Sequence, residues 1–298
     1  PDPQPAGRMT WEEYNKKLEE IRRRAERSVI GQAPSLEKLA YQLMVDYVDE
    51  NFTVRGGRFV IDERVLTALN DFVDRYLGAF TTSAQYQGAV GQYLKNFDDL
   101  QSLMERFQRS KGLDLRVARL GAVQEVVVNE ILNRYSENGL NPGFVQPMRD
   151  LLFNNVTSGL SKTEALSQLK EYIAGGKDTT GKLHRYLEQT AQQGVDSYTG
   201  AVNTRIMQTF DINTMIVSGS LIATSSTQCR FVINELNGLL DREDWPEVES
   251  IAGDELIEGT TFDNLPFNKL HWGCRHEFTP AVLSEAERRN ISQPKTNK

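Results

Sequence analysis

A single helical face runs through residues 180–210 and constrains how the rest of the chain can fold. Its apolar side chains recur every three or four residues, the spacing along one side of an α-helix, whereas a strand would alternate every second residue. The members of this face are Leu183, Leu187, Ala191, Val195, Tyr198, Val202, Ile206 and Phe210. A helix of about eight turns cannot bury such a face by itself. We therefore predict one long helix over about residues 180–210 that packs its apolar face against other parts of the chain.

The chain before this segment also carries the signals of helices joined by short connections. A Ser or Thr followed three residues later by Glu, as in Thr10–Glu13 and Ser161–Glu164, is a capping box that satisfies backbone N–H groups at a helix start. The expected helices span about 10–28, 34–51, 62–80, 83–111, 114–138, 145–157 and 162–174. Short connections favour antiparallel neighbours, so a helical bundle is predicted over residues 10–176.

Three parts of this bundle carry separate expectations. Residues 114–138 are unusually apolar, which favours a central helix. The first helix has a narrow apolar stripe that includes Trp11, Leu18 and Ile21, and we expect this stripe to be exposed and to bind a partner. The Arg-Gly-Gly-Arg run at residues 55–58 fits a hairpin, because a Gly-Gly pair tolerates the positive φ of tight turns, but it fits a plain loop equally well.

The hydrophobic period changes after Asp211. Residues 215–224 are rich in strand-forming side chains and predict one or two strands, followed by a Ser-Ser-Thr turn at residues 225–227. The mean hydropathy of −0.48 indicates a high ratio of surface to core. The predicted fold class is therefore mainly α, with an elongated helical N-terminal region followed by a small α+β C-terminal domain.

The expected domain limits follow these changes of pattern. Residues 1–9 contain three prolines and are predicted to be a disordered tail. Residues 10–176 form the helical domain, and residues 177–283 hold the long helix and the α+β domain. The polar residues 284–298 are expected to form a flexible tail. The Gly-Gly-Lys-Asp run at residues 175–178 is the clearest linker.

Charge argues against stable, general nucleic-acid binding. The formal net charge is −7, and the basic residues are interleaved with acids even in the densest run, at residues 16–27. A protein that neutralises phosphates should carry a basic patch. No stretch approaches the ~18 apolar residues of a membrane span, so no membrane association is expected. No signal peptide is visible at residues 1–9.

Residue types that bind metals gather near the C-terminus. Residues 271–276 read His-Trp-Gly-Cys-Arg-His and hold two of the three histidines and one of the two cysteines. Together with Cys229, the side chains of His271, Cys274 and His276 supply the four ligands of a tetrahedral zinc site. Cys229 lacks the nearby second ligand of a usual zinc half-site. Two other interpretations stay open: buried thiols beside hydrogen-bonded histidines, or one disulfide.

The sequence holds no recognisable catalytic centre. A Cys-His nucleophilic pair would need an orienting third group and an exposed thiolate of low pKa, and neither is visible. Glu255 and Glu258 could act as general acid and base on a helix, but nine acids between residues 235 and 258 make a solvated face the better interpretation. His184 is interpreted as a surface or partly packed residue. We therefore assign no catalytic or organic-cofactor-binding residue and predict a protein that is not an enzyme.

Four short motifs follow one another between Asn203 and Pro280. They are Thr-Ser-Ser-Thr-Gln-Cys at 224–229, Asn-Gly at 237–238, Leu-Pro at 265–266 and His-Trp-Gly-Cys-Arg-His at 271–276. This order resembles the C-terminal domain of phage Mu F-like minor head proteins, the phage head morphogenesis family, whose closing motif is His-Pro-Asn-Cys-Arg-Cys. Here Trp272 and Gly273 replace Pro and Asn, His276 replaces the last cysteine, and no second cysteine closely follows Cys229. Since histidine can replace cysteine on zinc, four candidate ligands remain.

The resemblance implies a structural virion protein. Members of this family are expected inside the phage head near the portal, as minor capsid components that assist head assembly and DNA packaging or delivery. The implied partners are the portal and the major capsid or scaffolding protein, with several copies in each particle, after a stage in the host cytoplasm. Two alternatives stay open: a hydrolase or transferase that uses the C-terminal acids and histidines, and an internal protein ejected with the genome.

Overall fold

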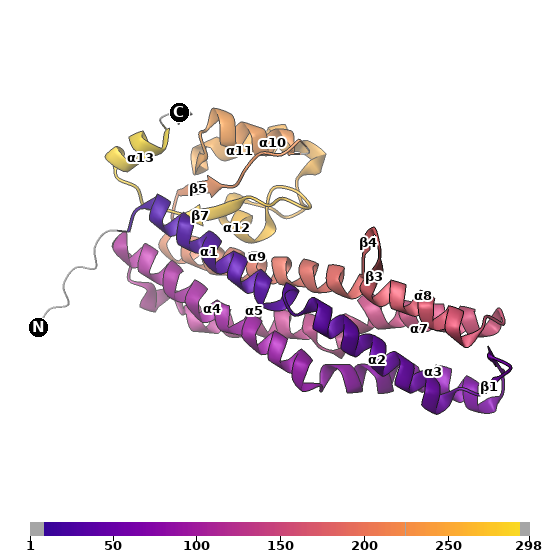
Figure 1. Cartoon of the computed structure of the whole chain (residues 1–298). Coiled ribbons are helices and arrows are strands. Elements are labelled where there is room, and N and C mark those ends of the chain that lie inside the picture. Colours follow the sequence, from indigo (N-terminus) through magenta and orange to yellow (C-terminus); the bar gives the residue numbers. More distant parts are fainter. Residues whose placement is uncertain (1–8, 224, 293–298) are drawn as a thin grey trace, which may run out of the picture. The chain divides into compact units, whose positions relative to one another are not determined.

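The computed structural model describes residues 9–223 and 225–292 and has a mainly α fold with a small α+β region near the C-terminus (Figure 1). This confirms the predicted fold class. The predicted disordered tail lies outside the described residues, except for Met9. The longer helices are α1 (Trp11–Ile30), α2 (Ala33–Asn51), α3 (Glu63–Thr81), α4 (Ala84–Ser110), α5 (Leu120–Tyr135), α7 (Gln146–Thr157), α8 (Lys162–Ala174) and α9 (Lys182–Phe210).

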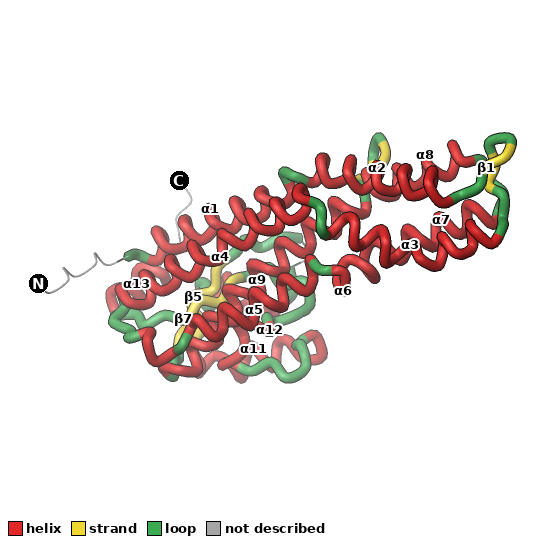
Figure 2. Tube along the Cα trace, turned by 90° about the horizontal axis from the view of Figure 1, so that it is seen from below, coloured by secondary structure: helices red, strands yellow, loops and turns green. Residues whose placement is uncertain are grey.

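The remaining elements are short and concentrate in the C-terminal region. The helices are α6 (Glu137–Leu140), α10 (Thr227–Arg230), α11 (Trp245–Ala252), α12 (Leu265–Asn268) and α13 (Glu285–Ser292). The strands are β1 (Val54–Arg55), β2 (Arg58–Phe59), β3 (Gly175–Gly176), β4 (Thr179–Thr180), β5 (Thr214–Ser218), β6 (Leu239–Asp241) and β7 (Glu277–Pro280). Figure 2 shows the strands, in yellow, as small insertions in a helical chain.

The chain divides into two compact units, each assembled from separated segments. The described parts of the first unit are residues 9–21, 97–128 and the part of the chain from residue 195 onward, and the second unit comprises residues 22–96 and 129–194. This division differs from the predicted boundary between residues 176 and 177. The cause is that α1, α4, α5 and α9 each contribute to both units, so no polar or Gly-rich linker marks the boundary in the sequence.

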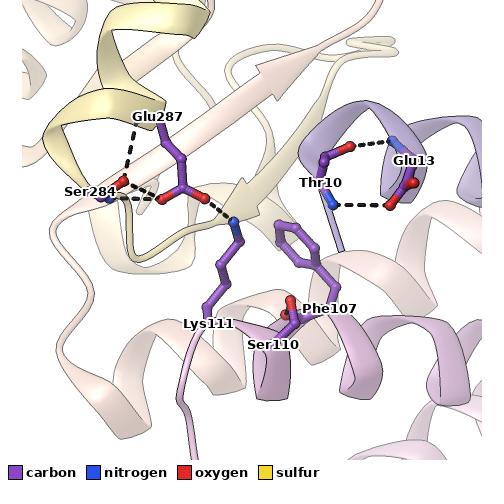
Figure 3. Close-up of polar contacts among 7 residues, drawn as sticks. All are labelled: Thr10, Glu13, Phe107, Ser110, Lys111, Ser284 and Glu287. Atoms are coloured by element: carbon purple, nitrogen blue, oxygen red, sulfur yellow. Dashed lines mark hydrogen bonds and ion pairs between the residues drawn. The ribbon is translucent and has the colours of Figure 1, made fainter. Parts of the chain in front are cut away.

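The helix starts follow the capping signals. Thr10 and Glu13 exchange two hydrogen bonds of 3.2 Å between backbone N–H groups and side-chain oxygens, which Figure 3 shows. Ser161 and Glu164 form the same reciprocal box at the start of α8. The carboxylate of Asp62 accepts a hydrogen bond of 2.9 Å from the backbone N–H of Val65. Each cap satisfies N–H groups that have no partner inside the helix, so the sequence locates these helix starts closely.

Two Gly-Gly pairs form hairpins. Val54 pairs with Phe59 in β1–β2, and Gly56 and Gly57 between them have φ values of 57° and 76°. This settles the predicted choice between hairpin and loop. At the predicted linker, Gly175 pairs with Thr180 in β3–β4. Residues 175–180 therefore form a hairpin with a two-residue turn rather than an open linker.

The apolar stripe of α1 is buried at Tyr14 and Leu18 and half-buried at Trp11 and Ile21, all of them in the first unit. The rings of Tyr14 and Phe107 stack with centroids 4.2 Å apart, and the Leu18 side chain is fully buried. Trp11 packs on a small cluster in the C-terminal region that includes Ile216 and Ala281. The predicted exposure is therefore wrong for Leu18, whereas Trp11 and Ile21 are half-buried and binding of a partner stays a prediction. The stripe is narrow because only one side of α1 packs against other helices, as is usual for a surface helix.

The apolar segment at residues 114–138 is not a central helix. Arg119 has a φ of 49°, which separates a short 3-10 turn at residues 115–118 from α5. On α5, Val127 is buried, but Val126 is 69% exposed. The prediction counted apolar residues without asking whether they share one face. Successive valines point in different directions around a helix, so half of this run faces solvent.

A three-stranded antiparallel sheet organises the C-terminal region, in the order β6–β5–β7. The central strand β5 pairs Met215 with Leu240 on one side and with Pro280 on the other. Its first four residues are buried, which explains the continuous apolar run of Met215, Ile216 and Val217. The region predicted as one or two strands holds one, because the chain leaves the sheet after Ser218 and residues 219–223 form a loop.

The polar segment after residue 283 begins with a docked helix. Ser284 and Glu287 form a capping box at the start of α13, and Lys111 Nζ lies 2.5 Å from Glu287 Oε1 (Figure 3). Arg288 reaches Asp241 of β6 at 2.7 Å. The predicted flexible tail is therefore wrong for residues 284–292, and residues 293–298 lie outside the described part. The Ser-x-x-Glu signal was present in the sequence.

None of the helices in the described ranges is both long enough and apolar enough to span a membrane.

Candidate metal centre

The first candidate ligand, Cys229, lies on the short helix α10. The Ser226 hydroxyl caps this helix by accepting from the backbone N–H of Cys229 at 3.4 Å, so the predicted Ser-Ser-Thr turn is the start of α10. Only 2% of Cys229 is exposed. A one-turn helix with a fixed start holds the thiol in a defined direction.

The Asn-Gly motif returns the chain from this helix to the sheet. Asn237 and Gly238 both have positive φ, at 54° and 73°. The Gly238 carbonyl accepts from the Val217 N–H at 2.7 Å, and a Cβ on Gly238 would lie 2.7 Å from the carbonyl oxygen of Val217. Glycine is required here because any side chain would collide with β5. The motif thus fixes α10 beside the central strand.

The other two ligands come from a tight turn between α12 and β7. The Cys274 N–H donates to the His271 carbonyl at 3.1 Å, and Gly273 inside the turn has a φ of 79°. The turn directs the two side chains toward Cys229. His271 is half-buried, Cys274 is buried, and Trp272 between them is 84% exposed.

Cys229, His271 and Cys274 form one compact group, although 45 residues separate the two cysteines. The Sγ atom of Cys229 lies 3.3 Å from His271 Nε2 and 3.8 Å from Cys274 Sγ. All three ligand atoms lie within 4.8 Å of one another. Among the described residues, this is the group of cysteine, histidine and acidic side chains whose geometry suits a metal ion.

The distances in this group match the edges of a tetrahedral zinc site. With Zn–S near 2.3 Å and Zn–N near 2.0–2.1 Å, two sulfurs on one zinc lie about 3.8 Å apart, and a sulfur and a nitrogen about 3.5 Å apart. The observed 3.8 Å and 3.3 Å are close to both values. Both cysteines are free, and their separation is far longer than the ~2.05 Å of a disulfide bond. The separations between these ligand atoms therefore suit a tetrahedral zinc ion.

The orientation of His271 also suits a metal ligand. Its Nδ1 lies 2.9 Å from the Trp272 carbonyl oxygen, which can only accept a hydrogen bond. Nδ1 must therefore carry the proton, and in the neutral ring Nε2 presents its lone pair toward Cys229. Metal-binding histidines are typically held by this kind of hydrogen bond from the second ring nitrogen.

The contact between the two thiols shifts their pKa values in opposite directions. The hydrogen bond with Cys229 lowers the pKa of Cys274 well below its ordinary value, and His276 lowers the Cys274 pKa further, while burial opposes both effects. The hydrogen bond with Cys274 and burial raise the pKa of Cys229. Cys274 is therefore the member of the pair that loses its proton more easily, and a bound cation would favour loss of the proton from both thiols.

His276 lies beside the group but contacts only one of its members. Its Nδ1 lies 3.6 Å from Cys274 Sγ, and it is not one of the three residues whose ligand atoms all lie within 4.8 Å of one another. The side chain is 5% exposed, and its Nε2 has no hydrogen-bond partner among the described residues. Gly219 makes room for the ring, because a Cβ there would lie 2.8 Å from His276 Cδ2.

A buried ion pair fixes both ends of the ligand turn. Lys269 Nζ lies 3.6 Å from Glu277 Oε2 and donates to the His276 carbonyl at 3.1 Å. Asn203 of α9 donates to Glu277 Oε1 at 3.2 Å, and the Thr199 hydroxyl contacts Oε2. The sequence analysis did not identify these residues. A hint was available, since Thr199 and Asn203 are polar residues four apart beside the apolar face of the long helix.

The residues considered for catalysis do not form a catalytic arrangement. Glu255 ends a short 3-10 turn, and the extended backbone at Leu256 separates it from Glu258, so no helix presents both carboxylates on one face. Both side chains are exposed. The Cys229 thiol is buried and its pKa is raised. Cys274, whose pKa is lowered, is buried as well, so neither cysteine is the exposed thiolate of an activated nucleophile. His184 is half-buried on α9, in the other unit.

Comparisons of the chain with protein-family models, with curated proteins and with solved structures found no match. The resemblance to the Mu F-like minor head proteins therefore remains a prediction from the sequence motifs.

Proposed function

We propose that this chain is a minor structural protein of a phage head. It lies inside the capsid near the portal, contacts the portal and the capsid or scaffolding protein, and assists head assembly and DNA packaging or delivery. The observation that carries this proposal is that two of the sequence motifs, far apart along the chain, lie side by side in the structure. Cys229, which follows the Thr/Ser-rich turn, lies beside His271 and Cys274 of the closing motif. The resemblance orders these motifs in the same way, so their spatial meeting supports it.

The same proposal assigns a structural zinc ion to Cys229, His271 and Cys274. Two buried sulfurs and an oriented imidazole are the donors that zinc prefers in sites that stabilise a fold. His276 is the fourth ligand through Nδ1, which a small shift of its ring would bring closer to the other three. Zinc would link the turn after α12, which leads into β7, to α10, which precedes β6. It would therefore connect the two segments that lead into the edge strands of the sheet.

The enzyme alternative has less support. A zinc ion that acts on a substrate needs an open coordination position. Here the two sulfurs and the imidazole of His276 are buried, and Glu255 and Glu258 are exposed and unaligned. These features favour a stabilising role for the centre.

Mass spectrometry of purified phage particles from the source of this chain tests the proposal. The expected result is that the chain is present in mature heads and in proheads, in a small and fixed number of copies. Its absence from both would overturn the proposal. Comparing particles before and after genome release distinguishes a retained head protein from an internal protein that leaves with the genome.

A second experiment tests the role in assembly. Phage that encode the chain with Cys274→Ser should form heads that contain less of it, because the C-terminal region would be less stable. A variant with Glu258→Gln, which alters an exposed acid, is the control and should be incorporated normally. Equal incorporation of both variants would show that the metal centre is not needed for incorporation of the chain into heads.

A further inference from the structure

A polar pocket with three cations lies in the second unit, whereas the metal centre belongs to the first. Its volume is about 420 Å³, and its lining comes from one face of α9, from α5 and from the π-helix at residues 141–145. The cations are Arg134, Lys182 and Arg185. In a chain whose net charge is −7, a pocket lined by three cations and no carboxylate is a local exception.

The α9 side of the pocket follows one stripe of the helix. Lys182, Arg185, Gln189 and Gln193 are spaced three or four residues apart, so their side chains project along the same face. In residues 9–223 and 225–292, no carboxylate lies within ion-pair distance of Lys182 or Arg185. Both charges are therefore available to an anion.

The opposite side of the pocket is held in position by hydrogen bonds. Arg134 donates to the Gln193 side chain at 3.3 Å and lies 3.6 Å from the exposed Glu130. The Tyr186 hydroxyl donates to the Arg134 carbonyl at 2.5 Å. Gly143 lets the Tyr186 ring come close, because a Cβ at this position would lie 2.6 Å from the ring. These contacts preorganise the pocket before any ligand arrives.

The backbone of the pocket is itself unusual. Gly143 belongs to a π-helix, a conformation that is rare and often found at functional sites. Thr190, at 5% exposed, adds a buried hydroxyl to the lining. Cations, side-chain amides and a hydroxyl are together a set of donors, which suits an acceptor-rich anion.

We propose that this pocket binds a phosphate group carried by a ligand of about nucleotide size. Arginine guanidinium groups pair with phosphate oxygens through two parallel hydrogen bonds, and lysine adds a point charge. The pocket volume lies within the ~300–1,000 Å³ range of small-ligand sites. Three cations suit one or two phosphates rather than a long nucleic-acid tract, so the absence of general nucleic-acid binding is still expected. This inference does not depend on the proposed role in the phage head.

Calorimetric titration of the full chain tests this proposal with two probes, inorganic pyrophosphate and a single-stranded oligonucleotide of about six nucleotides. We expect pyrophosphate to bind and the affinity to fall as salt rises. Binding of pyrophosphate alone identifies a free phosphate compound as the ligand. Tighter binding of the oligonucleotide identifies a nucleic-acid backbone. If neither probe binds at millimolar concentration, the proposal is overturned.

The double variant Lys182→Gln/Arg185→Gln should weaken binding at least tenfold. The matched control is Arg64→Gln/Arg75→Gln, which removes the same charge from a pocket of about 400 Å³ that also contains Glu63 and Asp71. This control should bind as the wild-type chain does. Gln189→Glu introduces a negative charge at an exposed position and should also weaken binding without unfolding the chain. Equal affinity of the wild-type chain and the Lys182/Arg185 variant would contradict the assignment.

Discussion

The Sγ atoms of Cys229 and Cys274 lie 3.8 Å apart without a bond between them. The strand β6 and the helices α11 and α12 lie between these cysteines along the chain, and His271 completes the group at 3.3 Å from Cys229. Buried thiols placed in this way need either a shared proton or a metal ion. The orientation of His271 favours the metal, and this is the basis of the zinc centre that we propose.

Removing one sulfur should remove the metal and the stability that it provides. For Cys274→Ser we expect loss of bound zinc and a lower melting temperature. A ligand present at a thousand times its dissociation constant stabilises a fold by about 4 kcal/mol. Calorimetric melting with and without a chelator measures this effect. The chelator should lower the melting temperature of the wild-type chain and leave the variant unchanged, and an equal response of both proteins would contradict a zinc site at Cys274.

The two histidines should contribute differently to metal affinity. His271 belongs to the compact group, whereas His276 contacts Cys274 alone. We expect His271→Gln to abolish stoichiometric zinc binding, and His276→Gln to weaken binding by roughly 10–100-fold while the stoichiometry is kept. Competition with a zinc-binding dye measures both affinities. If His276→Gln binds zinc as tightly as the wild-type chain does, His276 is not a ligand and water takes the fourth position.

The contact between Lys111 and Glu287 should make the docking of α13 depend on pH. The hydrogen bond from Lys111, together with the Ser284 cap, lowers the pKa of Glu287 from its ordinary 4.5 to about 2. A carboxylate with a lowered pKa contributes stability that is fully present above about pH 5 and is lost as the pH falls toward 2. Because 38% of the Glu287 side chain is exposed, this contribution is expected to be about 0.5–1 kcal/mol.

The variant Glu287→Gln measures how much the Glu287 carboxylate contributes to stability at each pH. The stability difference from the wild-type chain should be constant above pH 5 and should disappear as the pH falls to about 2. Glu285→Gln alters an acid of the same helix that is 87% exposed, and this control should change stability by less than about 0.5 kcal/mol. Urea unfolding at several pH values measures both variants. A difference between Glu287→Gln and wild type that does not vary with pH would contradict the ion pair.

The buried pair of Lys269 and Glu277 should matter more to stability than any exposed ion pair. Glu277→Gln leaves the Lys269 ammonium without its charged partner, and breaking a buried pair from one side costs about 3–5 kcal/mol. The double variant Lys269→Met/Glu277→Gln should recover part of this loss, because no buried charge remains. Urea unfolding of the wild type, the two single variants and the double variant forms a complete cycle. Additive losses would show that the two charges do not interact.

Much of the helical fold could be predicted from local signals. Capping boxes such as Thr10–Glu13 give helix starts because they satisfy backbone groups within a few residues. The α13 helix was missed although Ser284 and Glu287 carry the same signal, because the segment is polar and its docking partners Lys111 and Asp241 are distant in sequence. The direction of side chains on α5 was also missed, since apolar composition alone does not assign a face.

The residues of the candidate site could be predicted from the sequence, but their arrangement in space could not. Residue types identify Cys229, His271 and Cys274 as possible ligands, and a tight turn explains how the last two meet. No local rule gives the approach of Cys229, because it depends on the Asn237-Gly238 turn returning the chain to β5. The supporting pair of Lys269 and Glu277 is likewise formed only by tertiary packing against α9.

The metal content of the purified chain is the most direct test of the zinc centre. Elemental analysis should find about one zinc ion per wild-type chain and almost none in Cys274→Ser, as expected for a site with sulfur and imidazole ligands. A wild-type chain that is fully folded, contains no zinc, and melts at the same temperature with or without added zinc would contradict the account.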